Sequence, residues 1–225
     1  MPPDVSVIIA VYNEEAAIGG LLDSLPATES AELIAVDGGS TDRSAELAAQ
    51  RARVVRSPLG RGVQMNAGAK IATGRVLLFL HADVRLAPGA LDRIRLAMQD
   101  GAVVGGNFDI RYEGDDLPAR VFTRVNRWRR RWGILYGDSG IFCRRAVFES
   151  LGGFEPWPIM EDYEFGRRLA KAGKLALLDA PIRVSARRWR KGGLLRTLWS
   201  WFLIQSLYSL GLPPARLARI YRHIR

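Results

Sequence analysis

The first strong pattern in the chain is VSVIIAVYNEE, residues 5–15. Its β-branched apolar part, Val5–Val11, is too short to span a membrane and predicts a buried β-strand. The polar turn Asn13-Glu14-Glu15 comes next, and a helical spacing of apolar residues follows it as far as Pro26. A strand, an acidic turn and a helix therefore make up the first unit of the predicted fold.

The same unit recurs along the chain. Apolar runs predict further strands at 33–36, 53–56, 76–80, 103–112 and 182–186, and helical patterns lie at 45–51, 62–72, 89–99, 117–132 and 161–172. This alternation predicts an α/β fold with a mostly parallel central sheet and helices on both faces. No glycine- or proline-rich linker divides it.

Three predicted strands are followed by acidic loops: Asn13–Glu15, Asp37–Asp42 and His81–Asp83. In open α/β sheets, ligands bind at the carboxyl ends of the strands. We therefore expect these carboxylates to converge on one edge of the sheet, as a metal or nucleotide site.

The composition fits one globular domain. The chain has 225 residues, of which 48% are hydrophobic and 25% charged, enough to bury a full core. Its single cysteine, Cys143, excludes an internal disulfide and a cysteine zinc site and favours a reducing compartment. Residues 1–15 lack the basic start of a signal peptide, so we expect a cytoplasmic protein.

Positive charge is concentrated at the end of the chain. No acidic residue follows Asp179, but ten of the chain's 33 Lys and Arg residues do. The rest of the chain therefore has 23 basic and 23 acidic residues and is neutral. A cationic tail on a neutral body favours an anionic partner: a substrate phosphate, an anionic lipid surface or nucleic acid. A solvated surface that keeps the protein soluble is the alternative.

The most apolar segment, Leu194–Leu212, lies within this tail. Arg196 interrupts its start, and the 16 residues from Thr197 to Leu212 are fewer than the roughly 20 needed to span a bilayer. One interpretation is a helix packed on the core or at a homodimer interface. The other is a helix lying in the plane of a membrane, flanked by arginines and carrying two tryptophans.

Single residues suggest phosphate and metal chemistry. Asp83, after an apolar strand, offers a hard oxygen ligand for Mg²⁺ or Mn²⁺, although such an Asp is more often a turn residue. Asp37 at a strand end could accept hydrogen bonds from a base or ribose. Arg61, between two glycines before a helix, could approach a phosphate.

Glu161-Asp162 opens a predicted helix. Carboxylates are favoured there by the helix dipole, which explains the pair without any catalytic role. The functional interpretation is that one of the two is a general base for a hydroxyl nucleophile.

Together these motifs resemble the family 2 glycosyltransferases, within residues 4–190, and among them the short single-domain bacterial subgroup. The motifs that carry the resemblance are Val7–Glu15, Asp37–Asp42, Gly60-Arg61-Gly62 with Asn66–Gly68, His81–Asp83, Gly137–Gly140, Glu161-Asp162 and Ser185–Trp189. The resemblance implies a GT-A catalytic domain at 1–190, followed by a basic and apolar helical tail at 191–225. It also implies inverting, metal-dependent transfer from a nucleotide-diphosphate sugar, usually a UDP-sugar, to an acceptor hydroxyl.

The resemblance also assigns residues. Asp162 matches the catalytic base, and Asp83 the last Asp of the family's metal motif, which would hold Mn²⁺ or Mg²⁺. The expected donor-binding residues are Ala10, Tyr12, Glu14, Glu15, Asp37, Arg61, His81, Ala82, Asp138, Glu161, Arg188 and Trp189. Among these, Tyr12 would lie against the base. Two positions depart from the family: His81 stands where many members have Asp, and Ala10 replaces a common Pro.

Two other functions fit parts of the sequence. A nucleotidylyltransferase also combines an α/β sheet, a glycine-arginine loop and acidic metal ligands, but it does not need Glu161-Asp162. A non-catalytic module could bind a membrane surface or an anionic polymer through the tail. We expect no nucleic-acid partner, because no groove-reading motif is present. A lipid acceptor at the inner face of the plasma membrane would explain both the charge and the apolar segment.

Overall fold

The computed structural model describes residues 4–25, 31–114, 116–131, 134–184 and 193–224. Its strands are β1 (Val5–Val11), β2 (Glu32–Asp37), β3 (Arg53–Arg56), β4 (Val76–His81), β5 (Val84–Leu86), β6 (Val103–Tyr112), β7 (Ile141–Arg144) and β8 (Lys174–Val184). Its α-helices are α1 (Glu15–Ser24), α2 (Ser44–Ala49), α3 (Arg61–Ile71), α4 (Ala90–Ala97), α5 (Leu117–Arg130), α6 (Arg145–Ser150), α7 (Glu161–Ala172), α9 (Leu194–Ser209) and α10 (Pro214–Ile224). A short 3₁₀ turn, η1, covers Gly137–Ser139.

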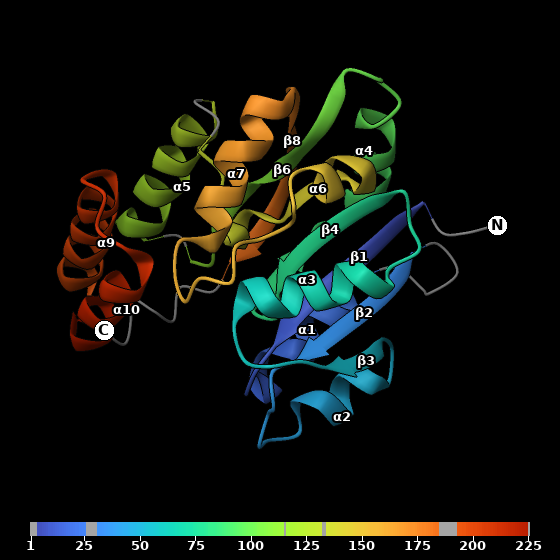
Figure 1. The fold of residues 1–225 in the computed structure, drawn as a ribbon, viewed down its shortest axis with the longest axis horizontal. Helices are drawn as coiled ribbons and strands as arrows, with labels where there is room; N and C mark the ends of the chain where they lie inside the picture. The colour runs from blue at the N-terminus through green and yellow to red at the C-terminus, as the bar shows by residue number, and fades with distance from the viewer. Residues whose placement is uncertain (1–3, 26–30, 115, 132–133, 185–192, 225) are drawn as a thin grey trace.

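The strands form one sheet in the order β3-β2-β1-β4-β7-β6-β8-β5 (Figure 1). Neighbours from β3 to β4 are parallel, and so are β6 and β8. Strand β7 runs antiparallel to both β4 and β6, and β5 runs antiparallel to β8. The predicted mostly parallel α/β sheet is confirmed.

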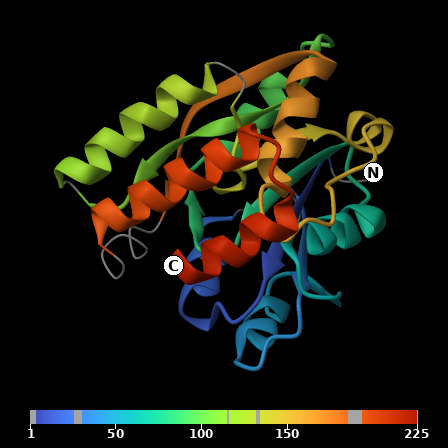
Figure 2. The same ribbon diagram turned by 60° about the vertical axis from the view of Figure 1, so that its left-hand side comes forward.

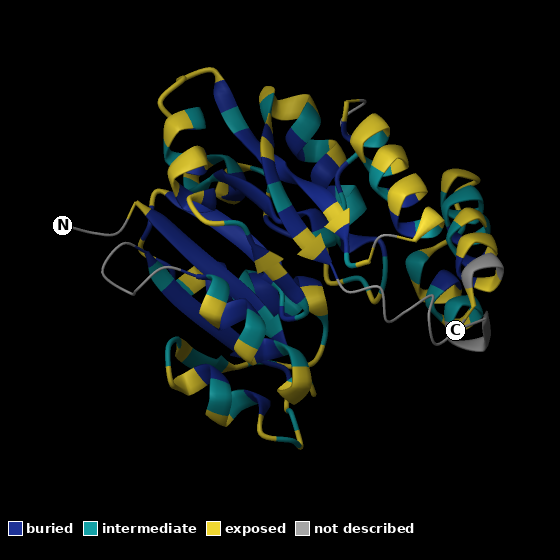
Figure 3. Ribbon diagram, turned by 180° about the vertical axis from the view of Figure 1, so that it is seen from behind, coloured by how far each residue is buried: buried dark blue, intermediate teal, exposed yellow. Residues whose placement is uncertain are grey.

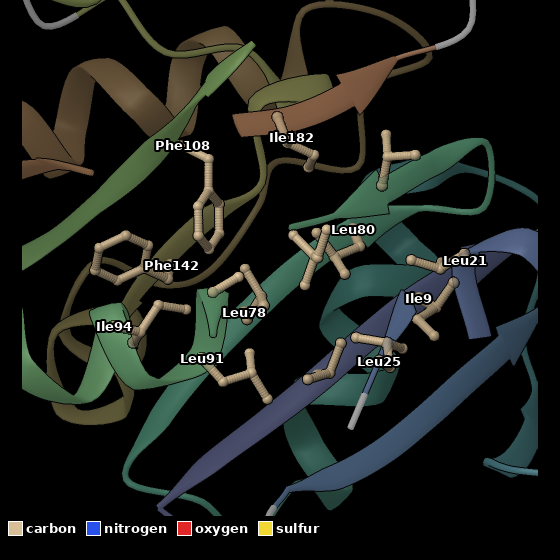
Figure 4. Packing of buried hydrophobic residues seen from close by; sticks show 14 of the residues in the cluster. Ile9, Leu21, Leu25, Leu78, Leu80, Leu91, Ile94, Phe108, Phe142 and Ile182 are labelled. Carbon is tan, nitrogen blue, oxygen red and sulfur yellow. The ribbon is translucent and has the colours of Figure 1, made fainter. Parts of the chain in front are cut away.

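Helices cover both faces of the sheet. One buried cluster joins β1, through Ile9, to α1 and α4, and Figure 4 shows this packing around Leu78 and Ile94. The other cluster joins Ile8 on the opposite side of β1 to α3, α6 and α7. Successive strand residues point to opposite faces, so two helical layers bury the continuous apolar runs. Figure 3 shows the central strands as the most buried part of the molecule.

Several boundaries differ from the sequence-based prediction. Strand β8 begins at Lys174, well before the predicted 182, and it continues through Pro181. Proline cannot donate a ladder hydrogen bond, but the pairing of β8 with β6 is irregular just before it. Phe108 pairs with Leu178 and Asp109 with Pro181, so the two extra residues, Asp179 and Ala180, form a bulge on β8. Helix α3 starts at Arg61 itself, so this arginine stands in the first helical turn and not in a loop before it.

The C-terminal helices lie beside α5, at the end of the molecule where Figures 1 and 2 place the chain's C-terminus. Helices α9 and α10 meet α7 in a small apolar cluster that contains Met160, Ile204 and Leu217. Pro214 opens α10, as proline often does in a first helical turn. Among the helices in the described ranges, none combines the length and apolarity needed to cross a bilayer.

Candidate active site

The ends of three parallel strands form one edge of the site. In the strand register, Val11 lies beside Asp37 and Ala10 lies beside His81. The predicted convergence of the loops after β1, β2 and β4 is therefore present in the structure.

Hydrogen bonds join the first two of these loops. The backbone N–H of Asn13 donates to Ser40 Oγ at 3.1 Å, and Asn13 Oδ1 accepts from the N–H of Thr41 at 2.9 Å. The N–H of Glu15 donates to Asp42 Oδ2 at 3.1 Å. Gln64 of α3, a buried residue, fixes the strand ends beneath them by donating to the carbonyl oxygens of Val11 and Val36. These contacts hold the loops as one rigid edge.

Asp37 is buried at this edge, and its Oδ1 accepts a hydrogen bond from the N–H of Ser40 at 3.0 Å. That bond closes the turn that follows β2, so part of the reason for an Asp here is structural. Tyr12 lies on the outside of the same edge with 43% of its surface exposed. An exposed ring above a rigid turn is available to stack on a flat ligand.

A cavity of about 200 Å³ lies next to this edge. Five residues predicted from the sequence line it together: Arg61, His81, Asp83, Asp138 and Asp162. Asp83 comes from the turn after β4, whereas Asp162 comes from the first turn of α7. Residues nearly 80 positions apart in the chain thus share one hollow.

Two backbone N–H groups orient the Asp162 carboxylate. Gly137 donates to Oδ2 and Tyr163 donates to Oδ1, each at 2.7 Å. A Cβ atom on Gly137 would lie 2.7 Å from His81 Nε2 and 3.1 Å from Asp162 Oδ2. Only glycine therefore lets η1 pass between these two side chains.

Backbone strain also occurs here. Among the described residues, two non-glycine residues have positive φ: Asn13 at 52° and Met160 at 68°. Both flank the site, and Met160 immediately precedes the Glu161-Asp162 pair. Such conformations cost free energy and persist where the surrounding structure holds them, often at functional sites.

Glu161 is almost fully buried behind Asp162, at 4% exposure. Its Oε1 lies 3.8 Å from Nε of Arg61. Burial, with the neighbouring Asp162 charge, raises the pKa of Glu161 to about 7, although Arg61 acts in the opposite direction. Glu161 thus changes its protonation near neutral pH, next to the carboxylate predicted to be the base.

The cavity wall contains residues that the sequence analysis did not single out. Tyr136 donates to Gln205 Oε1 at 3.0 Å and stacks on Tyr163 with ring centroids 5.7 Å apart. The guanidinium of Arg129 lies 5.6 Å from the centre of the Tyr136 ring. Burial raises the pKa of Tyr136 to about 12. Asn126, Trp201 and Tyr221 line the same space.

The other predicted residues lie around the cavity. Ala10, Tyr12, Glu14, Glu15, Asp37 and Ala82 belong to the strand-end edge and not to the cavity lining. Glu161 lines a smaller pocket that also contains Arg61, His81 and Asp162. Arg188 and Trp189 lie outside the described residues.

The carboxylate oxygens at the cavity suit a metal cation that is held partly by the protein and partly by the substrate. No three His, Cys, Asp or Glu side chains in the described ranges are grouped as a complete metal site. Asp83 nevertheless presents a carboxylate to the cavity near Asp138. Mg²⁺ and similar ions are often bound by one or two carboxylates, with substrate phosphates completing the shell. The residues present therefore fit a metal that binds together with a diphosphate.

Relatives identify the family. The model of "Glycosyl transferase family 2" matches residues 6–152. An uncharacterized protein of Mycobacterium tuberculosis is 32% identical over 83% of this chain and 67% of its own length. An undecaprenyl-phosphate 4-deoxy-4-formamido-L-arabinose transferase of Pseudomonas aeruginosa is 35% identical over 65% of this chain. The chain spans only 49% of that second relative's length.

Solved structures share the fold. A mannosyltransferase from Pyrobaculum calidifontis, in complex with GDP-Man and Mn²⁺, aligns over 99% of this chain and 69% of its own, with a TM-score of 0.67 and 22% identity. The S. aureus protein TarS, residues 1–349 with UDP-GlcNAc, aligns over 82% of this chain and 58% of its own, with a TM-score of 0.63 and 20% identity. The architecture is the GT-A fold of these enzymes. With the match over residues 6–152, it shows that the chain belongs to glycosyl transferase family 2.

Proposed function

We propose that this protein transfers a sugar from a nucleotide-diphosphate donor to an acceptor hydroxyl, with inversion at the anomeric carbon. The observation that carries the proposal is the shared cavity, in which Asp83 from the end of β4 meets Asp162 from the start of α7. One carboxylate would face the donor's diphosphate and the other the acceptor. Family membership supports the same chemistry.

Asp162 is the general base of this proposal. Its carboxylate is held by the N–H groups of Gly137 and Tyr163, so it meets the acceptor in a fixed orientation. The acceptor oxygen forms its bond to the anomeric carbon as the bond to the donor phosphate breaks. The hydroxyl proton goes to Asp162, and the nucleoside diphosphate leaves. No covalent enzyme intermediate is needed.

The strand-end edge would hold the nucleoside. Tyr12 would stack on the base, Glu14 or Glu15 would lie near the ribose, and Asp37 would meet the base edge, where one of its oxygens is already used by Ser40. Uridine is the usual base in the family. Arg61, in the first turn of α3, brings a cation to the cavity beside the diphosphate position.

A divalent cation fits next to Asp83. Mn²⁺ or Mg²⁺ held there would offset the charge that develops on the leaving diphosphate. The P. calidifontis mannosyltransferase was solved with Mn²⁺, which supports this expectation. His81 stands where many family members have Asp, so the site has one carboxylate fewer. We therefore expect the metal to bind weakly when the nucleotide is absent.

We also propose contact with a membrane surface, a homodimer and a cytoplasmic location. The relative from P. aeruginosa is named an undecaprenyl-phosphate 4-deoxy-4-formamido-L-arabinose transferase, and this name supports a lipid acceptor. Exposed apolar side chains on α9, Trp199 and Phe202 among them, are compatible with a nearby lipid phase.

A donor screen tests the proposal. Thermal shifts would be measured with UDP- and GDP-sugars, with and without Mn²⁺, and the products of turnover would be separated by ion-exchange chromatography. We expect stabilisation by one donor class and release of a nucleoside diphosphate. Pyrophosphate release from a nucleoside triphosphate would instead identify a nucleotidylyltransferase. Stabilisation by no nucleotide would favour a non-catalytic module.

A further inference from the structure

A second, larger hollow lies between α5 and α9. Its volume is about 840 Å³. Figures 1 and 2 both show the two helices side by side at one end of the molecule. Its walls are mainly apolar and are made by Leu117, Pro118, Val121, Phe122 and Val125 of α5 and Leu198, Trp201, Phe202 and Leu210 of α9 and its end. We call this hollow the α5–α9 groove.

The apolar walls follow from the spacing of residues on each helix. Leu117, Val121 and Val125 are four residues apart, so they form one stripe along α5. On α9, Leu198 and Phe202 repeat the same spacing. Phe122 and Trp201 close one side, with ring centroids 5.4 Å apart.

The protein's own core leaves this groove partly uncovered. Leu117 is 74% exposed, Phe202 is 64% exposed and Leu210 is 83% exposed. The side of α9 that is buried includes Thr197 and Ser200, two small polar residues. Contiguous exposed apolar surface of this kind marks a binding site more often than a solvated surface.

The groove adjoins the active-site cavity. Four residues line both spaces: Asn126, Arg129, Trp201 and Gln205. Two of them contact Tyr136. Gln205 Oε1 accepts a hydrogen bond from the Tyr136 hydroxyl, and the guanidinium of Arg129 lies over the Tyr136 ring. An occupant of the groove therefore passes from apolar walls to a cationic group, and then to the cavity that contains Asp162.

We propose that the α5–α9 groove binds the apolar chain of a single amphiphilic acceptor, whose anionic phosphate lies at Arg129 and whose acceptor hydroxyl reaches Asp162. This assignment rests on the proposed function, since it concerns the acceptor of the same reaction. Along the path lie the apolar groove, the Arg129 guanidinium and the Asp162 carboxylate. This order matches a lipid in which a phosphate joins the apolar chain to a headgroup that carries a hydroxyl. A bilayer would cover the outer faces of both helices but would not enter the cavity.

Alkyl phosphates of increasing length test the groove without knowledge of the natural acceptor. Butyl, hexyl and octyl phosphate would be titrated by calorimetry below their micelle concentrations. We expect affinity to rise with chain length, by up to about fourfold for each CH₂ that becomes buried. Octyl phosphate should also bind more tightly than octanol, and Arg129→Gln should remove that preference.

Two neighbouring residues of α9 provide a matched comparison. Phe202 lines the groove and Trp199 does not, yet they are exposed to a similar degree, 64% and 61%. Phe202→Asp should weaken octyl phosphate about tenfold or more, because a carboxylate would lie in an apolar wall. Trp199→Asp should leave its affinity unchanged. Val121→Asp on α5 serves as a second groove variant, and thermal melts check that each variant folds.

The outcomes separate the groove from the proposed function. Affinity that grows with chain length and is lost only in the groove variants supports the assignment. Equal losses in Phe202→Asp and Trp199→Asp would indicate general surface adsorption and would overturn it. Affinity independent of chain length, in a protein that binds a nucleotide sugar, would also overturn it. A protein that binds no nucleotide sugar would refute the proposed function itself.

Discussion

Replacing Glu161 with Gln should change how stability depends on pH. The structure raises the pKa of this buried carboxyl from an ordinary 4.5 to about 7. Between these values the folded protein binds a proton that the unfolded chain has lost, so stability falls as the pH rises through this window. A difference of about 2.5 pKa units corresponds to about 3 kcal/mol.

The uncharged amide removes this contribution. We expect Glu161→Gln to unfold at the same urea concentration as the wild type near pH 4.5, and to be more stable by up to about 3 kcal/mol at pH 8. Urea unfolding followed by circular dichroism, at several pH values, measures this. Glu149→Gln, at an exposed position in α6, is the control, since it leaves Glu161 in place and should keep the wild-type slope. Parallel pH profiles for wild type and Glu161→Gln would refute the reasoning.

Two further variants test the geometry of the cavity. Gly137→Ala places a Cβ atom 2.7 Å from His81 Nε2 and 3.1 Å from Asp162 Oδ2. One of these side chains must then move, and turnover should fall by about 10²-fold. Gly19→Ala is the control and should retain activity in the same assay, because its Cβ atom would meet nothing within 4 Å. Asp83→Ala should abolish the part of donor binding that depends on Mn²⁺, and calorimetry that finds the same metal dependence as in the wild type would remove Asp83 from the metal site.

Local patterns in the sequence predicted the strand-end half of the site. Strand β1 and helix α7 have the predicted bounds, because a continuous apolar run and a 3.6-residue spacing identify such elements without tertiary information. The alternation of these elements also placed the loops after β1, β2 and β4 on one edge. The residues in these loops were therefore accessible to sequence reasoning.

The cavity wall was not accessible in the same way. Tyr136, Arg129 and Gln205 come from separate elements, and no local motif connects them. Their meeting depends on the antiparallel insertion of β7 and on the position of α9 beside α5, both of which are tertiary features. Strand β8 was predicted only at its end, since the bulge that carries the strand past Pro181 depends on its pairing with β6.

The most direct test of the account is the turnover of Asp162→Asn, measured as nucleoside diphosphate released in the presence of donor and acceptor. The amide keeps the shape of the side chain and an acceptor for the N–H of Gly137, but it cannot take the proton of the acceptor hydroxyl. We predict that turnover falls by about 10²-fold or more while donor affinity is retained. Near-normal turnover in this variant would contradict the assignment of Asp162 as the base.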